Sequence, residues 1–240
     1  MSHPETAVIL VAAGAGTRMQ AAGNKTWLEL GGKTLIEHSL DEFAGIAWLR
    51  QRILVVRAEE QAKASARFSG KYAVELAVGG ARRQDSVYAG LQRVSETAQW
   101  VLVHDAARPF FKAEALEQLA EALETGQCDG VILATPLPDT LKVVTPTLYI
   151  ERTIAREQLW QAQTPQLFRH NVLRQCLERS KQSGTVLTDE SQALEKYGFK
   201  VKVAQGSRSN FKLTIAEDYA IAELMSDNLR LKKSSDTGKN

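Results

Sequence analysis

Residues 7–19 read AVILVAAGAGTRM, a continuous apolar run followed at once by a loop of small residues. A run this short and this apolar is typical of a strand that is buried on both faces of a parallel sheet. Similar runs follow at 53–56, 74–78, 100–104 and 130–135. The sequence therefore predicts a buried, mostly parallel sheet.

Helical patterns lie between these runs, because apolar residues three or four positions apart share one face of a helix. The residues are Ile36, Leu40 and Phe43, then Val87, Leu91 and Val94, then Leu116, Leu119 and Leu123. Alternating strands and helices predict an α/β fold with a doubly wound sheet. Since such sheets bind ligands beyond the carboxyl ends of their strands, functional side chains should follow the strands directly.

The pattern changes at residues 136–154. Prolines punctuate two β-prone pieces, 140–144 and 148–154, which predicts a β-hairpin arm that projects from the sheet and turns near Pro146. A hairpin with few core residues is not stable alone. We expect this arm to pack on another surface, such as a second subunit.

Three elements are expected between the arm and the last helix. They are helices near 171–180 and 189–197 and a strand at 199–204. The last helix is predicted to begin at Thr214, with Glu217 completing a capping box. These elements fit one domain over residues 1–231, followed by a solvated, disordered tail at 232–240.

Composition excludes several classes of protein. The net charge of the 240 residues is +2, too small to indicate a nucleic-acid partner. No apolar run approaches the roughly 20 residues that span a bilayer, so no membrane partner is expected. Cys128 and Cys176 have no disulfide or zinc spacing, which favours a cytoplasmic protein without a metal site of its own.

The loop after the first apolar run matches neither of the two familiar glycine motifs. The dinucleotide fingerprint needs glycine where Met19 stands, and a Walker A motif ending at Thr34 needs glycine at Trp27. What remains is A-A-G-x-G-T-R, with Lys25 seven residues after Arg18. Its N–H groups can cradle phosphate oxygens while the two cations neutralise a triphosphate. The alternative is a strand-to-helix turn with two solvated cations.

Two more segments follow predicted strands. The glycines at 79–80 permit close approach of a planar base, whose edge Ser86 could bond; the alternative is a turn with Asp85 at a helix N-terminus. After the fourth strand, Asp105 could bind a hydroxyl or a hydrated metal ion, and Arg108 a phosphate. The alternative is an ion pair between these two residues.

Arg156 and Thr164, in the second half of the chain, are a cation and a hydroxyl that could hold a phosphate. Both follow the arm, and Lys212 offers a cation before the last helix. Thr188 begins a predicted helix, and the role of an ordinary N-cap is sufficient to explain it.

In order and spacing, these segments resemble the 2-C-methyl-D-erythritol 4-phosphate cytidylyltransferase family over about residues 7–223. The resemblance implies a Rossmann-like, three-layer nucleotidyltransferase fold. It also implies CTP as the nucleotide, Mg²⁺ held mainly by the CTP phosphates, and a homodimer joined by interlocking β-arms.

The resemblance further implies that Arg18 and Lys25 stabilise the transition state and that Arg156 and Lys212 orient the attacking phosphate. The implied nucleotide contacts are Ala12, Ala13, Gly14, Ala15, Gly16, Thr17, Gly80 and Ser86, and the implied acceptor contacts are Asp105, Arg108, Thr164 and Thr188. Arg156 and Thr164 match positions that the arm of a partner subunit supplies.

The chain departs from the family pattern at three positions. Val11 stands where proline is usual, and Trp27 where tyrosine is common. Ala81 stands where an acidic residue can lie near the nucleotide, so the resemblance implies no such contact here.

The implied reaction transfers CMP from CTP to 2-C-methyl-D-erythritol 4-phosphate and releases pyrophosphate. The acceptor phosphate is already ionised at neutral pH, so positioning and fixed positive charge, rather than a general base, carry the catalysis.

Two alternatives stay open: transfer to another polyol phosphate, such as ribitol 5-phosphate, and nucleotide binding without turnover. The TDESQALE stretch at 188–195 favours methylerythritol phosphate, and the presence of both Arg18 and Lys25 favours turnover. Met19 disfavours a nicotinamide dehydrogenase.

Overall fold

The computed structural model describes residues 3–14 and 24–236, with residues 228–236 described through their backbone alone. Seven strands form one sheet in the order β11-β7-β10-β6-β1-β4-β5, in which only β10 runs antiparallel to its neighbours. The strands are β1 Thr6–Val11, β4 Leu49–Val56, β5 Val74–Val78, β6 Trp100–Asp105, β7 Gly130–Pro136, β10 Trp160–Arg169 and β11 Val201–Gln205. The predicted mostly parallel sheet is confirmed, whereas β10 is not among the predicted strands.

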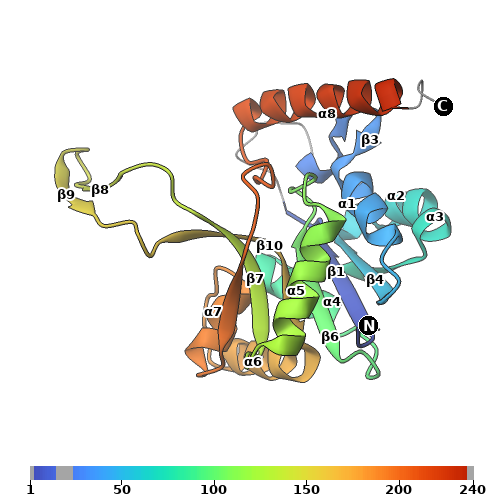
Figure 1. Cartoon of the computed structure of the whole chain (residues 1–240). Helices are drawn as coiled ribbons and strands as arrows, with labels where there is room; N and C mark the ends of the chain where they lie inside the picture. The colour runs from blue at the N-terminus through green and yellow to red at the C-terminus, as the bar shows by residue number, and fades with distance from the viewer. Residues whose placement is uncertain (1–2, 15–23, 237–240) are drawn as a thin grey trace.

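Helices cover both faces of the sheet and give three layers (Figure 1). On one face lie α1 (Leu35–Ala44), α5 (Ala113–Thr125) and a run of short helices: η3 Ala58–Glu60, α2 Gln61–Ala64, η4 Ser65–Ser69 and α3 Gly70–Tyr72. On the other face lie α4 (Arg83–Leu91), α6 (His170–Gln182) and α7 (Glu190–Lys196). Each face buries its own apolar cluster, as the alternation of short apolar runs with amphipathic helices predicts.

Local sequence explains where α1 begins. Thr34 precedes the helix, and its hydroxyl accepts a hydrogen bond from the Glu37 N–H at 3.2 Å, while the Glu37 carboxylate accepts one from the Thr34 N–H at 2.8 Å. This capping box satisfies donors that the first turn of a helix leaves unpaired. Ile36, Leu40 and Phe43 then point into the core, as their spacing predicts.

The last helix differs from its prediction at both ends. Helix α8 covers Ala216–Asp236, and the Thr214 hydroxyl donates to the Asp218 carboxylate at 2.7 Å rather than pairing with Glu217. The predicted capping box is therefore wrong, because the acidic partner lies one residue further along. The helix also continues into the segment 232–240, for which the sequence predicts a disordered tail. Residues 237–240 lie outside the described range.

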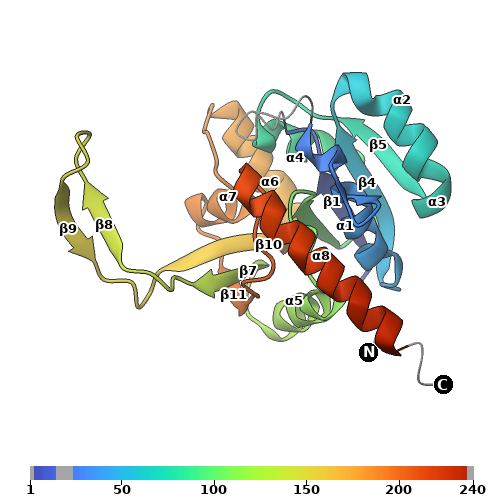
Figure 2. The ribbon, with the colours of Figure 1, turned by 90° about the horizontal axis from the view of Figure 1, so that it is seen from above.

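Helix α8 lies across the body over a small third core (Figure 2). This core contains Leu30 and Leu35, from the short hairpin β2 (Glu29–Leu30) and β3 (Lys33–Thr34) and the start of α1, together with Leu213 and Ala222. In the part of the chain that the structure describes, no helix is long and apolar enough to cross a membrane.

The predicted arm is a two-stranded hairpin, β8 (Leu141–Val144) and β9 (Ile150–Ile154), that projects away from the body (Figures 1 and 2). Its tip is apolar and open to solvent. Leu148 is 80% exposed, Tyr149 75% and Ile150 65%. A hairpin of this size with its apolar side chains exposed has no core of its own.

Candidate functional site

The carboxyl ends of the central strands meet at one edge of the sheet. Val11, the last residue of β1, lies in register with Val55 of β4 and Asp105 of β6, and β5 ends alongside β4 at Val78. The loops that follow these strands therefore converge on one place, which is where parallel sheets bind ligands.

Two side chains draw the start of the segment 24–27 back to the end of β1. The Asn24 amide donates to the Ala12 carbonyl at 2.5 Å, and the Thr26 hydroxyl donates to the same carbonyl at 3.2 Å. Lys25 lies between them, and its Nζ donates to the Leu213 carbonyl at 2.6 Å. The fold thus places the Lys25 ammonium at this edge of the sheet.

A cleft of about 410 Å³ opens at this edge. Seven of the residues expected to bind nucleotide or acceptor line it: Ala13, Gly14, Lys25, Gly80, Ser86, Asp105 and Lys212. Ala12 lies beside them and is fully buried. Ala15, Gly16, Thr17 and Arg18 lie outside the described residues, so their expected roles stay predictions.

The cleft is strongly cationic. Among the described residues that line it, Lys25, Arg57, Arg82, Arg83 and Lys212 are cations, and Asp105 is the acidic residue. An excess of cations around a cleft favours a polyanionic ligand, such as a triphosphate.

The glycine pair forms a tight turn between β5 and α4. The Gly80 N–H donates to the Ser86 hydroxyl at 3.2 Å, and that hydroxyl donates to the Arg82 carbonyl at 3.3 Å. A Cβ on Gly80 would lie 2.5 Å from the Cβ of Asp85, and one on Gly79 would lie 2.4 Å from the Cβ of Ala13. Side chains at these two positions would therefore push the loops apart and obstruct the cleft.

Asp105 is held by two cations. Its carboxylate accepts from Arg83 Nε at 2.8 Å and from Lys212 Nζ at 2.7 Å. Burial alone would raise the pKa of Asp105, but Arg83 and Lys212 hold that pKa well below its usual range, so the carboxylate stays ionised. The alternative of an ion pair with Arg108 is wrong, since Asp105 pairs with these two residues instead.

Arg108 does not line the cleft in the described structure. Its guanidinium donates to the Asn210 carbonyl at 2.8 Å and to the Ala162 carbonyl at 3.3 Å. Burial lowers the pKa of Arg108 from its usual value. These contacts join the segment before α8 to β10, so a phosphate contact for Arg108 stays a prediction.

Thr164 differs from the expectation that a partner's arm supplies it. It lies in β10, inside the sheet of its own chain, and its hydroxyl accepts from the Asp105 N–H at 3.0 Å. The hydroxyl lies 3.1 Å from His104 Nδ1, and His104 Nε2 lies 3.1 Å from the Arg108 carbonyl. Burial lowers the pKa of His104 to about 3, so the ring is neutral. It can therefore accept from Thr164 and donate to Arg108.

Arg156 and Thr188 lie apart from this cleft. Arg156 lies between β9 and β10, where the arm joins the body. Thr188 is exposed, and its hydroxyl donates to Gln192 at 3.2 Å. The N-cap of α7 is Asp189, whose carboxylate accepts from the Gln192 N–H at 3.0 Å, so the alternative that Thr188 is the cap is wrong by one residue.

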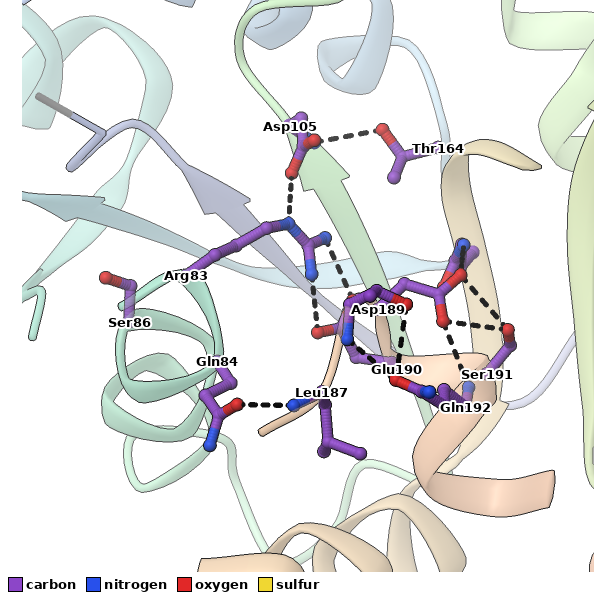
Figure 3. A network of polar contacts seen from close by, with 12 residues as sticks. Arg83, Gln84, Ser86, Asp105, Thr164, Leu187, Asp189, Glu190, Ser191 and Gln192 are labelled. Atoms are coloured by element: carbon purple, nitrogen blue, oxygen red, sulfur yellow. Dashed lines mark hydrogen bonds and ion pairs between the residues drawn. The ribbon is translucent and has the colours of Figure 1, made fainter. Parts of the chain in front are cut away.

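Arg83, which lines the cleft, and its partner Glu190 carry no role in the sequence analysis. The Arg83 guanidinium bonds Asp105 on one side and the buried Glu190 carboxylate on the other, at 2.8 and 2.9 Å (Figure 3). The glycine-rich segment contains Arg83 and the TDESQALE stretch contains Glu190. Their separation of 107 residues leaves no local spacing that could indicate the contact.

Comparisons with known proteins agree on one family. The family model for 2-C-methyl-D-erythritol 4-phosphate cytidylyltransferase matches residues 6–228. The cytidylyltransferase of this name from Serratia proteamaculans is 40% identical over 222 residues, which cover 92% of this chain and 94% of that one.

Solved structures are similar over the whole fold. The 2-C-methyl-D-erythritol 4-phosphate cytidylyltransferase of Francisella tularensis superposes with a TM-score of 0.80 at 30% identity, covering 92% of this chain and 99% of that one. The Thermus thermophilus enzyme of the same name gives a TM-score of 0.78 at 28% identity, covering 95% and 100%. With the cationic cleft, the loops at the sheet edge and the projecting arm all in place, this chain belongs to the 2-C-methyl-D-erythritol 4-phosphate cytidylyltransferase family.

Proposed function

We propose that the cleft binds CTP beside 2-C-methyl-D-erythritol 4-phosphate and transfers CMP to the acceptor. The products are 4-diphosphocytidyl-2-C-methyl-D-erythritol and pyrophosphate. The observation that carries this proposal is the gathering of Lys25, Lys212 and Asp105 around one cationic cleft, which Gly80 of the glycine turn also lines. Family membership supports the choice of both substrates.

The chemistry requires no general base. An oxygen of the acceptor phosphate attacks the α-phosphorus of CTP, a new P–O bond forms, and the bond to the bridging oxygen of the departing pyrophosphate breaks. Since the acceptor phosphate is ionised at neutral pH, no proton has to be removed. The barrier comes from bringing two anions together, so fixed cations such as Lys25 and Lys212 lower it by preorganised charge.

We further propose that Mg²⁺ enters with CTP, held mainly by the phosphates. Among the described residues, no group of three or more His, Cys, Asp or Glu side chains could hold a metal ion. The carboxylate in the cleft, Asp105, already accepts from Arg83 and Lys212. The described side chains therefore suit a metal ion that the nucleotide phosphates carry into the cleft. The metal would further neutralise the charge of those phosphates.

A homodimer joined through the arms is also part of the proposal. The exposed apolar tip of the arm supports it, because a second subunit could bury Leu148, Tyr149 and Ile150. In such a dimer Arg156, at the root of the arm, would reach the cleft of the other subunit. Thr164 stays with its own chain.

The assay that tests the proposed function compares acceptors. Purified protein is incubated with CTP, Mg²⁺ and either 2-C-methyl-D-erythritol 4-phosphate or ribitol 5-phosphate, and pyrophosphate is measured. We expect release with the methylerythritol substrate and about 10- to 100-fold less with ribitol 5-phosphate, since ribitol lacks the methyl branch and carries an additional hydroxyl, differences that discriminate between substrates by about this factor. Release with ribitol 5-phosphate alone, or with neither acceptor, would contradict the proposal.

Substitution of Lys212 is expected to impair use of the acceptor much more than binding of CTP. Lys212→Ala should reduce kcat/KM for the acceptor about 10- to 150-fold, because a charge-assisted contact is lost, while the Kd for CTP changes little. Steady-state kinetics and calorimetry with CTP measure the two effects. Lys33→Ala is the matched control, since Lys33 also pairs with an aspartate, Asp41, but outside the cleft. Equal weakening of CTP and acceptor binding would refute the assignment.

A further inference from the structure

Arg83 connects three elements around the cleft. It is the first residue of α4, and its Nε donates to Asp105 at the end of β6 at 2.8 Å. Its two terminal nitrogens donate to the two oxygens of Glu190, the first residue of α7, at 2.8 and 2.9 Å (Figure 3). One planar guanidinium therefore fixes the distance and orientation between two carboxylates that lie 85 residues apart in sequence.

The next residue of α4 holds the same neighbouring segment. The Gln84 side chain accepts from the Leu187 N–H at 2.7 Å and donates to the Thr185 carbonyl at 3.1 Å. In sequence, Thr188, an expected acceptor contact, therefore lies between Leu187, which bonds Gln84, and Glu190, which bonds Arg83. Figure 3 shows both of these contacts. The first turn of α4 sets the position of the whole segment 185–190.

The two carboxylates of this network are buried, and two cations balance their charge. The side chain of Glu190 is 1% exposed and that of Asp105 9%. Two carboxylates, Asp105 and Glu190, face two cations, Arg83 and Lys212. A buried carboxylate without a partner is costly, so Glu190 keeps the guanidinium in place and Arg83 keeps Asp105 oriented toward the cleft.

We infer that Arg83 is a positioning residue for the acceptor half of the site. Arg83 holds Asp105 directly, and it holds the segment that contains Thr188 through Glu190. Both are thereby kept in a fixed position relative to the glycine turn that receives the nucleotide. This inference rests on the proposed function. It assigns to Arg83 no contact with the reacting phosphates. Loss of Arg83 should therefore affect use of the acceptor far more than binding of CTP.

The test separates positioning from stability with a double substitution. Arg83→Gln leaves Glu190 buried without a partner and should lower Tm by about 10 °C. Arg83→Gln combined with Glu190→Gln removes both charges and should restore most of that loss. The kcat/KM of this double variant for 2-C-methyl-D-erythritol 4-phosphate should nevertheless stay at least about 10-fold below wild type, because Asp105 still lacks the hydrogen bond from Arg83. Its Kd for CTP, measured by calorimetry, should lie within about 3-fold of wild type.

Arg67→Gln is the matched control. Arg67 pairs with Glu37, whose side chain is 10% exposed, outside the cleft. This variant should lose stability without a specific loss of acceptor use. Full recovery of acceptor kinetics along with Tm in the double variant would reduce Arg83 to a structural role and overturn the inference. So would an equal loss of CTP affinity.

A conservative variant keeps the inference testable if the glutamine variants do not fold. Arg83→Lys retains the charge but cannot span Asp105 and both Glu190 oxygens in one plane. It should raise KM for the acceptor about 10-fold with CTP affinity unchanged, and an unaltered KM would contradict the inference. Wild-type protein that releases no pyrophosphate with this acceptor would instead contradict the proposed function, and it is measured before any variant.

Discussion

Replacing Lys25 with alanine is expected to lower kcat by at least about 100-fold, the usual cost of removing a preorganised charge that meets a developing negative charge. The backbone on both sides of Lys25 is fixed, because Asn24 and Thr26 both bond the Ala12 carbonyl. The ammonium, which donates to the Leu213 carbonyl, is therefore held at this edge of the sheet. We expect the same loss for Arg18→Ala, although Arg18 lies outside the described residues.

Single-turnover measurements at saturating CTP and acceptor would isolate the chemical step in the Lys25 variant. Lys71→Ala serves as the control, since Lys71 lies over the Tyr72 ring and away from the cleft. Its kcat should match that of wild type. If Lys25→Ala protein turned over within a few-fold of wild type, Lys25 would have no part in stabilising the transition state.

Mixing two inactive variants should restore about a quarter of wild-type activity if the arm reaches across a dimer axis. Lys25→Ala and Arg156→Ala protein are combined and allowed to exchange subunits. In a mixed dimer one site carries both lesions and the other carries neither. Random pairing makes about half of the dimers mixed, each with one intact site of two, which gives the quarter.

The projecting hairpin is the structural basis for this expectation. Figure 1 shows β8 and β9 standing clear of the body, and the segment that carries Arg156 lies at their root. Subunit exchange is followed with two differently tagged variants by native mass spectrometry. Mixed dimers that form yet remain inactive would show that Arg156 serves its own subunit, or none.

Much of the fold could be predicted because its signals are local. β1 and β6 are short apolar runs, and the helices on both faces repeat apolar residues every three or four positions. β10 gave no such signal. Its first three residues, Trp160 to Ala162, are exposed, and Pro165 lies in its middle, a residue that argues against a strand in the interior of a sheet. Only pairing with β6 and β7, both distant in sequence, makes this segment a strand.

In the candidate site, too, some features could be predicted from local sequence and others arise only from long-range contacts in the fold. Gly80 and Asp105 stand at the carboxyl ends of predicted strands, so their convergence on the sheet edge could be predicted from topology alone. The partners of Asp105 could not, because a local reading pairs it with Arg108, three residues away, whereas the fold brings Arg83 and Lys212 to it from distant segments. The family resemblance places Thr164 in a partner's arm, whereas the fold places it in β10 of its own chain.

The order of strands in the sheet has a consequence for synthesis of the chain. β1, β4, β5 and β6 are adjacent in the sheet and complete by residue 105, so this half can pair as soon as it leaves the ribosome. β7 lies between β10 and β11, both of which are made later. At about 5–20 residues per second, translation of the arm takes seconds, and during that time the apolar strand β7 has no neighbouring strand to pair with its N–H and C=O groups. During that interval the nascent polypeptide presents an unpaired strand edge, and this is the stage of its production at which it is most open to aggregation and to capture by chaperones.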